Sequence, residues 1–294
     1  MDQTRLLRKL SEMDGCSDYH IHSDYSGDGI HSVEDILEQA ARIGIRSLSI
    51  ADHDCTEGAK LAMKIAGSYS VQLVPAVELT TFFHHRFIHI LGYGFSLEED
   101  TGIQFLLSRI KKRRMDNMEQ IVALIQANGL HISRDDVLDM TGGRAPMVSS
   151  YAKVLLDDPE NMDCEILKPY REGQARGING PINFAVDYML DGGPLYVEEL
   201  PVTMEEGIGA IVASGGVAVM AHPGLWFRDE HLPVLKRLIR IGLSGMEVYT
   251  PYHTPEQVAY YKRIAKEHGL YMTHGSDFHG YAVKPRNRLG QFTI

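Results

Sequence analysis

Histidine and acidic residues gather in short motifs along the chain. The first motif, residues 18–28, reads DYHIHSDYSGD and carries His20 and His22 two positions apart. Side chains two positions apart on a strand lie on the same face, so we expect both imidazoles to point the same way. Two converging imidazoles before a glycine-containing acidic loop are typical of half a metal site. A surface pair, or one buried and one exposed histidine, explains an isolated His-x-His equally simply, so the other motifs must decide.

Further candidate metal ligands occur on other expected strands or at their ends. They are His53, Glu78, His89, His222, Asp277 and His279. In a closed α/β barrel the corresponding strand ends open on one face. Imidazoles and carboxylates delivered from many strands to one rim suit a polynuclear hydrolytic site, whereas structural zinc more often uses a compact, cysteine-rich set. A buried or solvated role explains any one of these residues alone but explains the whole set poorly.

The elements that must position these residues alternate between strand and helix in two parts of the chain. The first part predicts strands at 16–21, 45–51 and 71–77, helices at 32–43 and 57–66, and a hairpin or bent strand pair at 82–95. The second part predicts strands at 217–221, 245–248 and 270–273, with helices at 204–213, 231–241 and 255–268. This alternation indicates a parallel α/β fold with right-handed crossovers.

The stretch between these parts lacks the alternation. Its expected helices lie at about 98–128, 133–140, 147–156 and 181–190. No linker rich in proline or serine flanks it. We therefore expect residues 1–97 and 196–294 to form the two parts of one α/β domain, and residues 98–195 to form a helical insertion.

The composition excludes several classes of protein. Hydrophobic residues make up 44% and charged residues 23% of the chain, as in ordinary globular proteins. The net charge of -10 disfavours stable binding to duplex nucleic acid. No apolar run would span a bilayer, no signal peptide is recognised, and the three cysteines are scattered, so we expect a cytoplasmic protein without membrane partners. The oligomeric state has no signal in the sequence.

Taken in order, the motifs resemble those of the PHP (polymerase and histidinol phosphatase) superfamily. They are DYHIHS at 18–23, ADHD at 51–54, AVE at 76–78, HILGYG at 89–94, AHP at 221–223 and GSDFH at 275–279. The phrases GR at 143–144, GPLYV at 193–197 and GGVAVMAHP at 215–223 look like the TrpH-type phosphoesterase branch. The resemblance implies a distorted (β/α)7 barrel with a small inserted helical domain. It also implies metal-dependent hydrolysis of nucleotide phosphate esters: a 5′-nucleotide such as AMP, a 3′,5′-bisphosphonucleotide such as pAp, or the 5′ end of short RNA.

Carried over to this sequence, the resemblance implies three divalent metal ions, and Mn, Fe and Zn all suit mixed imidazole and carboxylate ligands. The first ion would be bound by His20, His22, Glu78 and Asp277. The second would be bound by Glu78, His89 and His222, and the third by Asp28, His53 and His279. Asp24 is an alternative to Asp28, because the loop can present either carboxylate.

The expected chemistry is attack on phosphorus by a hydroxide that bridges two of these ions, without a serine or cysteine nucleophile. The residues expected to act in catalysis are Glu78, His222, Asp277 and Asp52. Asp52 and Asp54 would orient His53 or a neighbour. The alternative is that they cap the helix that begins near Thr56.

Substrate selection is expected to depend on cationic and aromatic side chains. Arg144 follows two glycines and precedes a helix, so it could bind phosphate together with that helix's N-terminus. The Pro-His that usually follows this arginine in the family reads Ala-Pro-Met at 145–147 here. Arg286 and Arg288 follow the last motif together with Lys284, and Trp226 is the first candidate to stack on a base.

Three other functions remain open. The chain could be a histidinol-phosphate-type phosphatase that acts on another small phosphomonoester, although its long insertion argues against this. It could be a non-catalytic PHP module with structural metals, or a nucleic-acid-binding protein that uses its basic insertion. The full set of candidate ligands argues against the second function, and the net charge argues against the third. The expected partner is therefore a small phosphorylated nucleotide or a short oligonucleotide.

Overall fold

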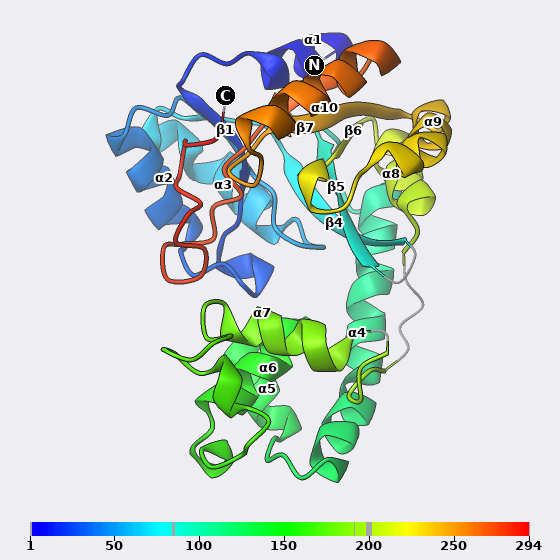
Figure 1. The fold of residues 1–294 in the computed structure, drawn as a ribbon. Helices are drawn as coiled ribbons and strands as arrows, with labels where there is room; N and C mark the ends of the chain where they lie inside the picture. The colour runs from blue at the N-terminus through cyan, green and yellow to red at the C-terminus, as the bar shows by residue number, and fades with distance from the viewer. Residues whose placement is uncertain (1, 84–85, 191, 198–201, 294) are drawn as a thin grey trace. The chain divides into compact units, whose positions relative to one another are not determined.

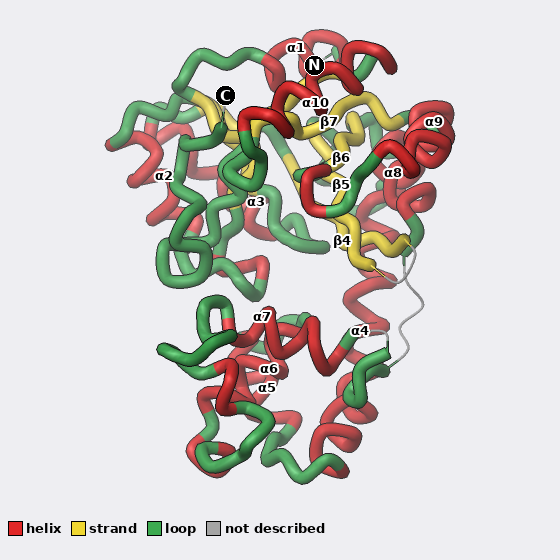
Figure 2. The backbone as a smooth tube through the Cα atoms, viewed as in Figure 1, coloured by secondary structure: helices red, strands yellow, loops and turns green. Residues whose placement is uncertain are grey.

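The computed structural model describes residues 2–83, 86–190, 192–197 and 202–293 (Figure 1). The chain divides into two compact units. One comprises Met1–Leu107 and Pro201–Ile294, and the other comprises Ser108–Leu200. Every described strand belongs to the first unit, and the described regular structure of the second is helical (Figure 2). We call them the α/β unit and the helical unit.

The strands of the α/β unit form two sheets, with the orders β1-β2-β3 and β4-β5-β6-β7-β8. Their bounds are β1 Ser17–Ile21, β2 Ser47–Ile50, β3 Gln72–Leu73, β4 Ala76–Phe83, β5 Arg86–Tyr93, β6 Val217–Met220, β7 Leu243–Tyr249 and β8 Tyr271–His274. Strands β1 to β3 are parallel, as are β6 to β8, whereas β5 is antiparallel to both β4 and β6. The predicted mixture of strands and helices is confirmed, but the sheets are not wholly parallel.

The strand expected at 71–77 is divided into β3 and β4. Pro75 lies between them, and a proline has no N–H to donate to a ladder. β4 then continues as far as Phe83, because it pairs residue by residue with β5, including Thr80 with His89. Glu78 therefore lies inside a strand and not at its end.

The predicted closed barrel is not formed by the described residues. The two sheets are connected by isolated bridges, Ile21 with Phe278 and His53 with Glu78. The backbone has positive φ at Asp54 (52°), His222 (24°) and Asp277 (50°), shortly after β2, β6 and β8. An extended ladder cannot continue through such residues. The segments that carry His53, His222 and Asp277 are therefore loops that leave the strands.

Helices cover the sheets of the α/β unit (Figure 1). Their bounds are α1 Gln3–Ser11, α2 Val33–Arg42, α3 Glu57–Ile65, α8 Met204–Ala213, α9 Leu232–Arg240 and α10 Pro255–His268. The predicted start of α2 is confirmed, since the Ser32 hydroxyl accepts a hydrogen bond from the Asp35 N–H at 3.1 Å. Ile36 and Leu37 of this helix are buried in the core around β1 and β2. Burial of each side chain stabilises the fold by about 1.5–3 kcal/mol.

The helical unit has a hydrophobic core of its own. Helix α4, Gly102–Ala127, continues from the α/β unit into this unit. It is followed by α5 Arg134–Thr141, α6 Val148–Asp157 and α7 Gly180–Phe184. Buried members of the core include Ile125, Tyr151, Leu155 and Phe184. The helical character predicted for the middle of the chain is therefore present.

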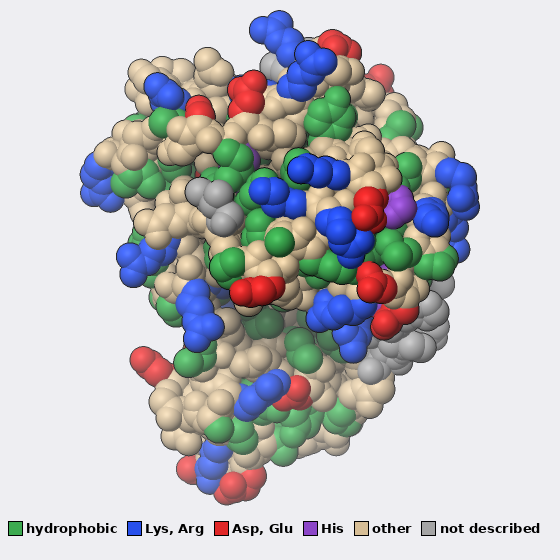
Figure 3. All heavy atoms as spheres, turned by 45° about the horizontal axis from the view of Figure 1, so that its top comes forward, with side chains coloured by type: hydrophobic (Ala, Val, Ile, Leu, Met, Phe, Trp, Pro, Cys, Tyr) green, Lys and Arg blue, Asp and Glu red, His purple; other side chains and the backbone are tan. Residues whose placement is uncertain are grey.

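The surface carries charges of both signs. On the face shown in Figure 3, Lys and Arg side chains are interspersed with Asp and Glu. The field above this face is therefore mixed and not of one sign. Among the described residues, no helix has both the length and the apolar character needed to cross a bilayer.

Candidate metal centre

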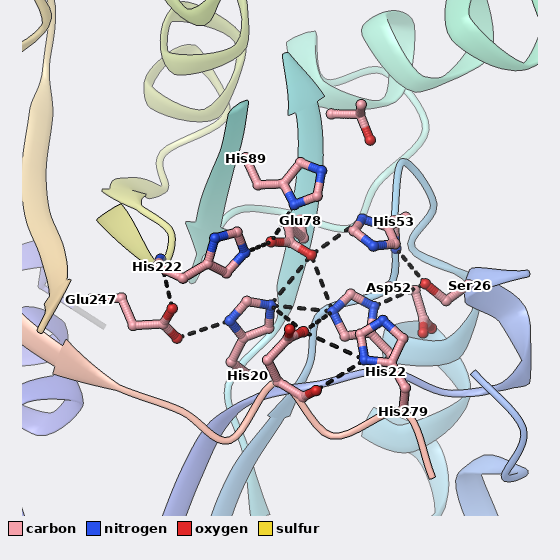
Figure 4. A network of polar contacts seen from close by, with 12 residues as sticks. His20, His22, Ser26, Asp52, His53, Glu78, His89, His222, Glu247 and His279 are labelled. Carbon is pink, nitrogen blue, oxygen red and sulfur yellow. Dashed lines mark hydrogen bonds and ion pairs between the residues drawn. The ribbon is translucent and has the colours of Figure 1, made fainter. Parts of the chain in front are cut away.

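Strand β1 delivers two imidazoles to one point. His20 and His22 are both buried, and their Nε2 atoms lie 3.1 Å apart, as the i, i+2 spacing predicts (Figure 4). Behind His22, the Ser26 hydroxyl lies 2.9 Å from Nδ1. The same hydroxyl accepts a hydrogen bond from the main-chain N–H of His53 at 3.0 Å. The Nε2 atom of His22, which directly follows β1, is thereby directed at the interior of the cluster.

Glu78 lies at the middle of the cluster. Its Oε1 is 3.0 Å from Nδ1 of His89, which comes from β5, and 3.0 Å from Nε2 of His222, which follows β6. Its Oε2 faces three more imidazoles, at 3.3 Å from His20, 3.1 Å from His22 and 3.2 Å from His53. One buried carboxylate therefore meets histidines from β1, β5 and the loops after β1, β2 and β6 (Figure 4).

A second carboxylate, Asp28, lies near His53 and one further histidine. Its Oδ2 is 3.3 Å from Nε2 of His279 and 3.6 Å from Nε2 of His53. The ring of His279 stacks on that of His22 with centroids 3.9 Å apart. Of the two carboxylates that the sequence left open, Asp28 has the geometry of a ligand beside His53 and His279.

Asp277 contributes the third carboxylate, and its two oxygens have different surroundings. Oδ1 lies 3.1 Å from Nε2 of His22 and 3.4 Å from Nε2 of His20. Oδ2 accepts hydrogen bonds from the Tyr252 hydroxyl and from the Lys284 ammonium, the latter at 2.6 Å. One oxygen is therefore held from behind while the other faces the β1 histidines.

The electrostatics of the cluster keep its carboxylates ionised. Burial acts to raise the pKa of Glu78, but His89, His20 and His53 hold it well below its usual value. Burial likewise acts to raise the pKa of Asp277, and the Lys284 ammonium and nearby histidines hold it well below the usual range. Ionised carboxylates and imidazoles are the donor set that Mn, Fe and Zn accept.

The side chains fit a metal centre by two observations. Three groups of residues could each hold an ion, because the donor atoms within a group, one from each residue, all lie within 4.8 Å of one another. The groups are His20, His22, Glu78 and Asp277; His22, Asp28, His53 and His279; and His53, Glu78 and His89. Among the described residues, several buried polar atoms also have no hydrogen-bond partner, including Oε2 of Glu78, Oδ1 of Asp277 and Oδ1 of Asp28. Buried carboxylate oxygens without partners are costly unless a ligand completes them.

The three groups can be set beside the ligand sets expected from the sequence. The first group is the set expected for the first ion. The second contains Asp28, His53 and His279, with His22 in addition. The third contains Glu78 and His89 but has His53 where His222 was expected, although His222 also contacts Glu78.

Asp52 and Asp54 lie behind the cluster. Asp52 accepts hydrogen bonds from the N–H and the hydroxyl of Ser23, at 2.6 and 2.7 Å, and so fixes the residue after His22. Burial raises the pKa of Asp52 to about 6. Asp54 accepts a hydrogen bond from the N–H of Thr80 in β4 at 2.7 Å. Asp52 therefore orients a neighbour of His22, while the N-cap of α3 is Thr56.

The residues expected to bind substrate lie in varied surroundings. Arg144 is exposed in the loop between α5 and α6 of the helical unit, and Arg286 and Arg288 are exposed in the loop after β8. The Trp226 ring is only 8% exposed and packs against His231, with centroids 5.3 Å apart. Little of the Trp226 side chain is therefore accessible for a base to stack on in this structure, and its role in binding stays a prediction.

Sequence analysis missed Glu247. This residue lies on β7, is buried, and has its Oε1 2.8 Å from Nδ1 of His20. Its Oε2 accepts a hydrogen bond from the main-chain N–H of His222 at 2.8 Å. The available signal was a single acid between Met246 and Val248 in an apolar strand, which indicates a buried carboxylate with a partner.

Comparison with known proteins identifies relatives over nearly the whole chain. The model of the PHP domain matches residues 18–179, which is more than half of the chain. A phosphoribosyl 1,2-cyclic phosphate 1,2-diphosphodiesterase of Eggerthella lenta is 28% identical, over 90% of this chain and 94% of the relative. A 3′,5′-nucleoside bisphosphate phosphatase of Chromobacterium violaceum is 28% identical, and the match covers 89% of this chain and 86% of the relative. A 5′-3′ exoribonuclease of Salmonella typhimurium is 26% identical, and the match covers 89% of this chain and 84% of the relative.

Two solved structures share the fold. A protein of Bifidobacterium adolescentis, described as a candidate metal-dependent phosphoesterase, superposes with a TM-score of 0.75 and is 26% identical. The match covers 94% of this chain and 91% of that one. The second is a Chromobacterium violaceum protein described as an amidohydrolase, with bound sulfate and no metal. It superposes with a TM-score of 0.77 at 24% identity, and the match covers 95% of this chain and 91% of that one. The arrangement of strands and helices is therefore that of solved proteins.

Proposed function

We propose that this chain, which belongs to the PHP domain family and is a metal-dependent phosphoesterase, hydrolyses a phosphate ester of a nucleotide or of the 5′ end of a short RNA. The observation that carries this proposal is the convergence of five imidazoles on the buried Glu78 carboxylate. Such a cluster has little structural value without an ion, because desolvated charges are expensive to bury.

The proposed centre holds three divalent ions, Mn, Fe or Zn. His20, His22, Glu78 and Asp277 bind the first, Glu78, His89 and His222 the second, and Asp28, His53 and His279 the third. Bound divalent ions lower the pKa of a coordinated water and neutralise charge that develops on a phosphate.

The chain's own residues supply the positioning that this chemistry needs. Glu78 presents both oxygens to ligands from different strands, so it sets the distance between the two halves of the cluster. Lys284 and Tyr252 fix Asp277 through its outer oxygen and leave Oδ1 directed inwards. His89 is the most exposed of the histidines around Glu78, with 23% of its side chain accessible, and therefore marks the side from which a phosphate reaches the cluster.

The nucleotide substrate class is supported by the relatives. The bisphosphate phosphatase and the exoribonuclease are named for nucleoside and RNA substrates, and the diphosphodiesterase for a phosphoribosyl cyclic phosphate. All three substrates combine a pentose with phosphate. Arg286 and Arg288 are exposed guanidinium groups of the α/β unit that would bind the phosphate or a second phosphate of a bisphosphonucleotide, and the role of Arg144 stays a prediction from the sequence.

The proposal extends to the organisation of the chain. The two sheets and their helices form one α/β domain, and the helical stretch 98–195 is a domain inserted between its segments 1–97 and 196–294. The protein acts in the cytoplasm. The separation of the chain into two compact units, with a change near residues 107 and 201, supports this organisation.

A substrate screen tests the function. Purified protein is incubated with AMP, pAp, a short 5′-phosphorylated RNA, a ribosyl 1,2-cyclic phosphate and histidinol phosphate, with Mn present and then with excess chelator. We expect turnover of at least one nucleotide or RNA substrate that the chelator abolishes and that added Mn restores. Turnover of histidinol phosphate alone would instead support the alternative phosphatase, and turnover unaffected by chelator would contradict a metal-dependent mechanism.

A further inference from the structure

Glu247 connects two candidate ligands that come from different elements. Its carboxylate is fully buried on β7, with Oε2 on the main-chain N–H of His222 and Oε1 on Nδ1 of His20, each at 2.8 Å (Figure 4). His20 lies on β1 and His222 follows β6. A single side chain therefore contacts residues of both sheets at the cluster.

The direction of both hydrogen bonds follows from the chemistry of the groups. The main-chain N–H of His222 can only donate, and an ionised carboxylate can only accept. The Nδ1 atom of His20 must therefore carry a proton to bond with Oε1. In the neutral ring this leaves the lone pair on Nε2, the atom that lies 3.3 Å from Oε2 of Glu78 and 3.4 Å from Oδ1 of Asp277.

We propose that Glu247 is a positioning residue of the metal centre, which fixes the Nδ1–H tautomer of His20 and anchors the main chain at His222. This inference rests on the proposed function, because it assigns Glu247 to the support of ligands that the function requires. Carboxylates behind a ligating imidazole fix its tautomer and orientation in many metal sites. The anchor on His222 has a second role, since this residue holds a φ of 24° that its side chain disfavours.

The alternative is a buried carboxylate that only stabilises the fold. The substitution Glu247→Gln separates the two roles. Because the His222 N–H needs an acceptor, the glutamine oxygen remains there and its NH2 group faces Nδ1 of His20. That ring nitrogen must then accept, so the proton moves to Nε2 and blocks the atom that would bind the ion. A merely structural role predicts no such change of tautomer.

The experiment uses the full chain loaded with Zn and combines metal binding with NMR. Zinc content is measured after dialysis, affinity by competition with a chromogenic chelator, and the ring nitrogens of His20 by 15N NMR with assignment from His20→Gln. We expect Glu247→Gln to weaken the ion bound through His20 by about 10- to 100-fold and to remove the Nδ1–H signature. Glu247→Leu also leaves the His222 N–H without its acceptor, so it should weaken the binding of a second ion as well.

Asp18→Asn is the matched control. Asp18 is also a fully buried carboxylate, and it lies on β1. It accepts hydrogen bonds from the N–H and hydroxyl of Ser276 and from the N–H groups of Gly290 and His20, and among the described residues no ring nitrogen donates to it. This variant should lose stability and keep the His20 ring signature. If Glu247→Gln fails to fold, Glu247→Asp replaces it in the experiment. The two oxygens of aspartate can still accept hydrogen bonds, so the Nδ1–H signature of His20 should persist in that variant.

The outcomes separate the inference from the function beneath it. A wild-type chain that binds no zinc, and no Mn in the same assay, would overturn the proposed function. A wild-type chain that binds zinc, together with a folded Glu247→Gln variant of equal affinity and unchanged ring signals, would overturn only the role of Glu247. In a His20→Gln background, Glu247→Gln should bring no further loss of affinity, and a loss as large as in wild type would also contradict the inference.

Discussion

The two oxygens of Glu78 meet different histidines, and this makes the residue the most sensitive position of the cluster. Oε1 faces His89 and His222, whereas Oε2 faces His20, His22 and His53. An amide in its place would have one oxygen for two sets of partners, and its NH2 group would oppose a cation. The geometry of its neighbours therefore favours a carboxylate over an amide at this position, and in the proposed centre that carboxylate would serve two ions.

Glu78→Gln should lower the activity at least about 100-fold, more than the loss expected for a supporting residue, and should reduce the number of bound ions. The measurements are kcat on the best substrate of the screen and metal content after dialysis. Glu267→Gln is the control: this carboxylate lies on the surface of α10 and, within the described part of the chain, pairs only with Arg263, so both quantities should stay unchanged. Full activity of Glu78→Gln with its normal metal content would contradict the proposed centre.

His274 provides a pH-dependent contribution to stability. The ring is buried beneath the cluster with its Nε2 2.9 Å from the Ser17 hydroxyl, and burial lowers its pKa to about 4. The unfolded chain titrates near 6.5, so above that pH His274 is neutral in both states. As the pH falls from 6.5 towards 4, the unfolded chain takes up a proton that the folded protein does not. The free energy of unfolding should therefore fall, by about 2 kcal/mol at pH 5.

The test is denaturant unfolding of the metal-free protein at pH 7 and pH 5. His274→Gln keeps a polar side chain of similar size but cannot titrate, so its decrease between the two pH values should be smaller than that of wild type by about 2 kcal/mol. Equal decreases in both proteins would show that His274 is not the group responsible.

Residue type and spacing were sufficient to predict the members of the cluster. His-x-His on a strand, and acids and histidines after other strands, carry that information locally. Glu247 could not be recognised in the same way, because its role depends on His20, which is 227 positions away. The burial of Trp226 could not be predicted either, since an aromatic residue close to a candidate ligand in sequence can be packed in the core or exposed at the surface.

At the scale of secondary structure, the strand termini and the glycines after them set the positions of the ligands. Gly275 follows β8 directly, and a Cβ atom there would lie 2.2 Å from Cβ of His20 and 3.0 Å from Oε1 of Glu247. The close approach of this loop to β1 therefore requires a residue without a side chain. It is this approach that brings Asp277 to the β1 histidines.

Gly275→Ala should force β8 and β1 apart and lower the free energy of unfolding by about 1–3 kcal/mol. It should also weaken metal binding, because His20 and Asp277 lie on opposite sides of the contact. Gly209→Ala is the control: a Cβ at this exposed position of α8 meets nothing within 4 Å, and the change should stabilise the helix by up to about 1 kcal/mol. Thermal and denaturant unfolding of both variants measure the difference, and equal stabilities would contradict the steric argument.

Helix boundaries were easier to predict than sheet topology. The cap at Ser32 and the glycine at Gly269, whose φ is 68°, mark the ends of α2 and α10 through local chemistry. The division into two sheets, the antiparallel pairing of β5 and the positive φ values at His222 and Asp277 were not predicted. Side chains of these types permit but do not require such conformations.

At the scale of the whole molecule, the candidate ligands join the two sheets where the ladder does not. His20 comes from the three-stranded sheet, and Glu78 and His89 come from the five-stranded sheet. The described backbone ladder between these sheets is reduced to isolated bridges. Individual hydrogen bonds, such as those of Glu247 with His20 and of Asp18 with Ser276, supplement it. Bound ions would therefore act as cross-links inside the α/β unit. Every candidate ligand belongs to that unit, whereas the helical unit has a separate core.

Removal of metal should consequently loosen one unit and spare the other. Ions at 100 times their dissociation constant stabilise the bound state by about 2.7 kcal/mol, which corresponds to roughly a hundredfold slower exchange of amides that open only with the centre. Hydrogen exchange with mass spectrometry, with Mn and with chelator, should show this slowing in peptides covering β1, β4, β5 and β8. Peptides from α6 and from the core around Phe184 serve as the internal control and should exchange equally in both conditions. An equal change of the exchange rates in both units would mean that metal binding governs the folding of the whole chain. Unchanged exchange rates in both units would mean that bound ions do not stabilise the α/β unit.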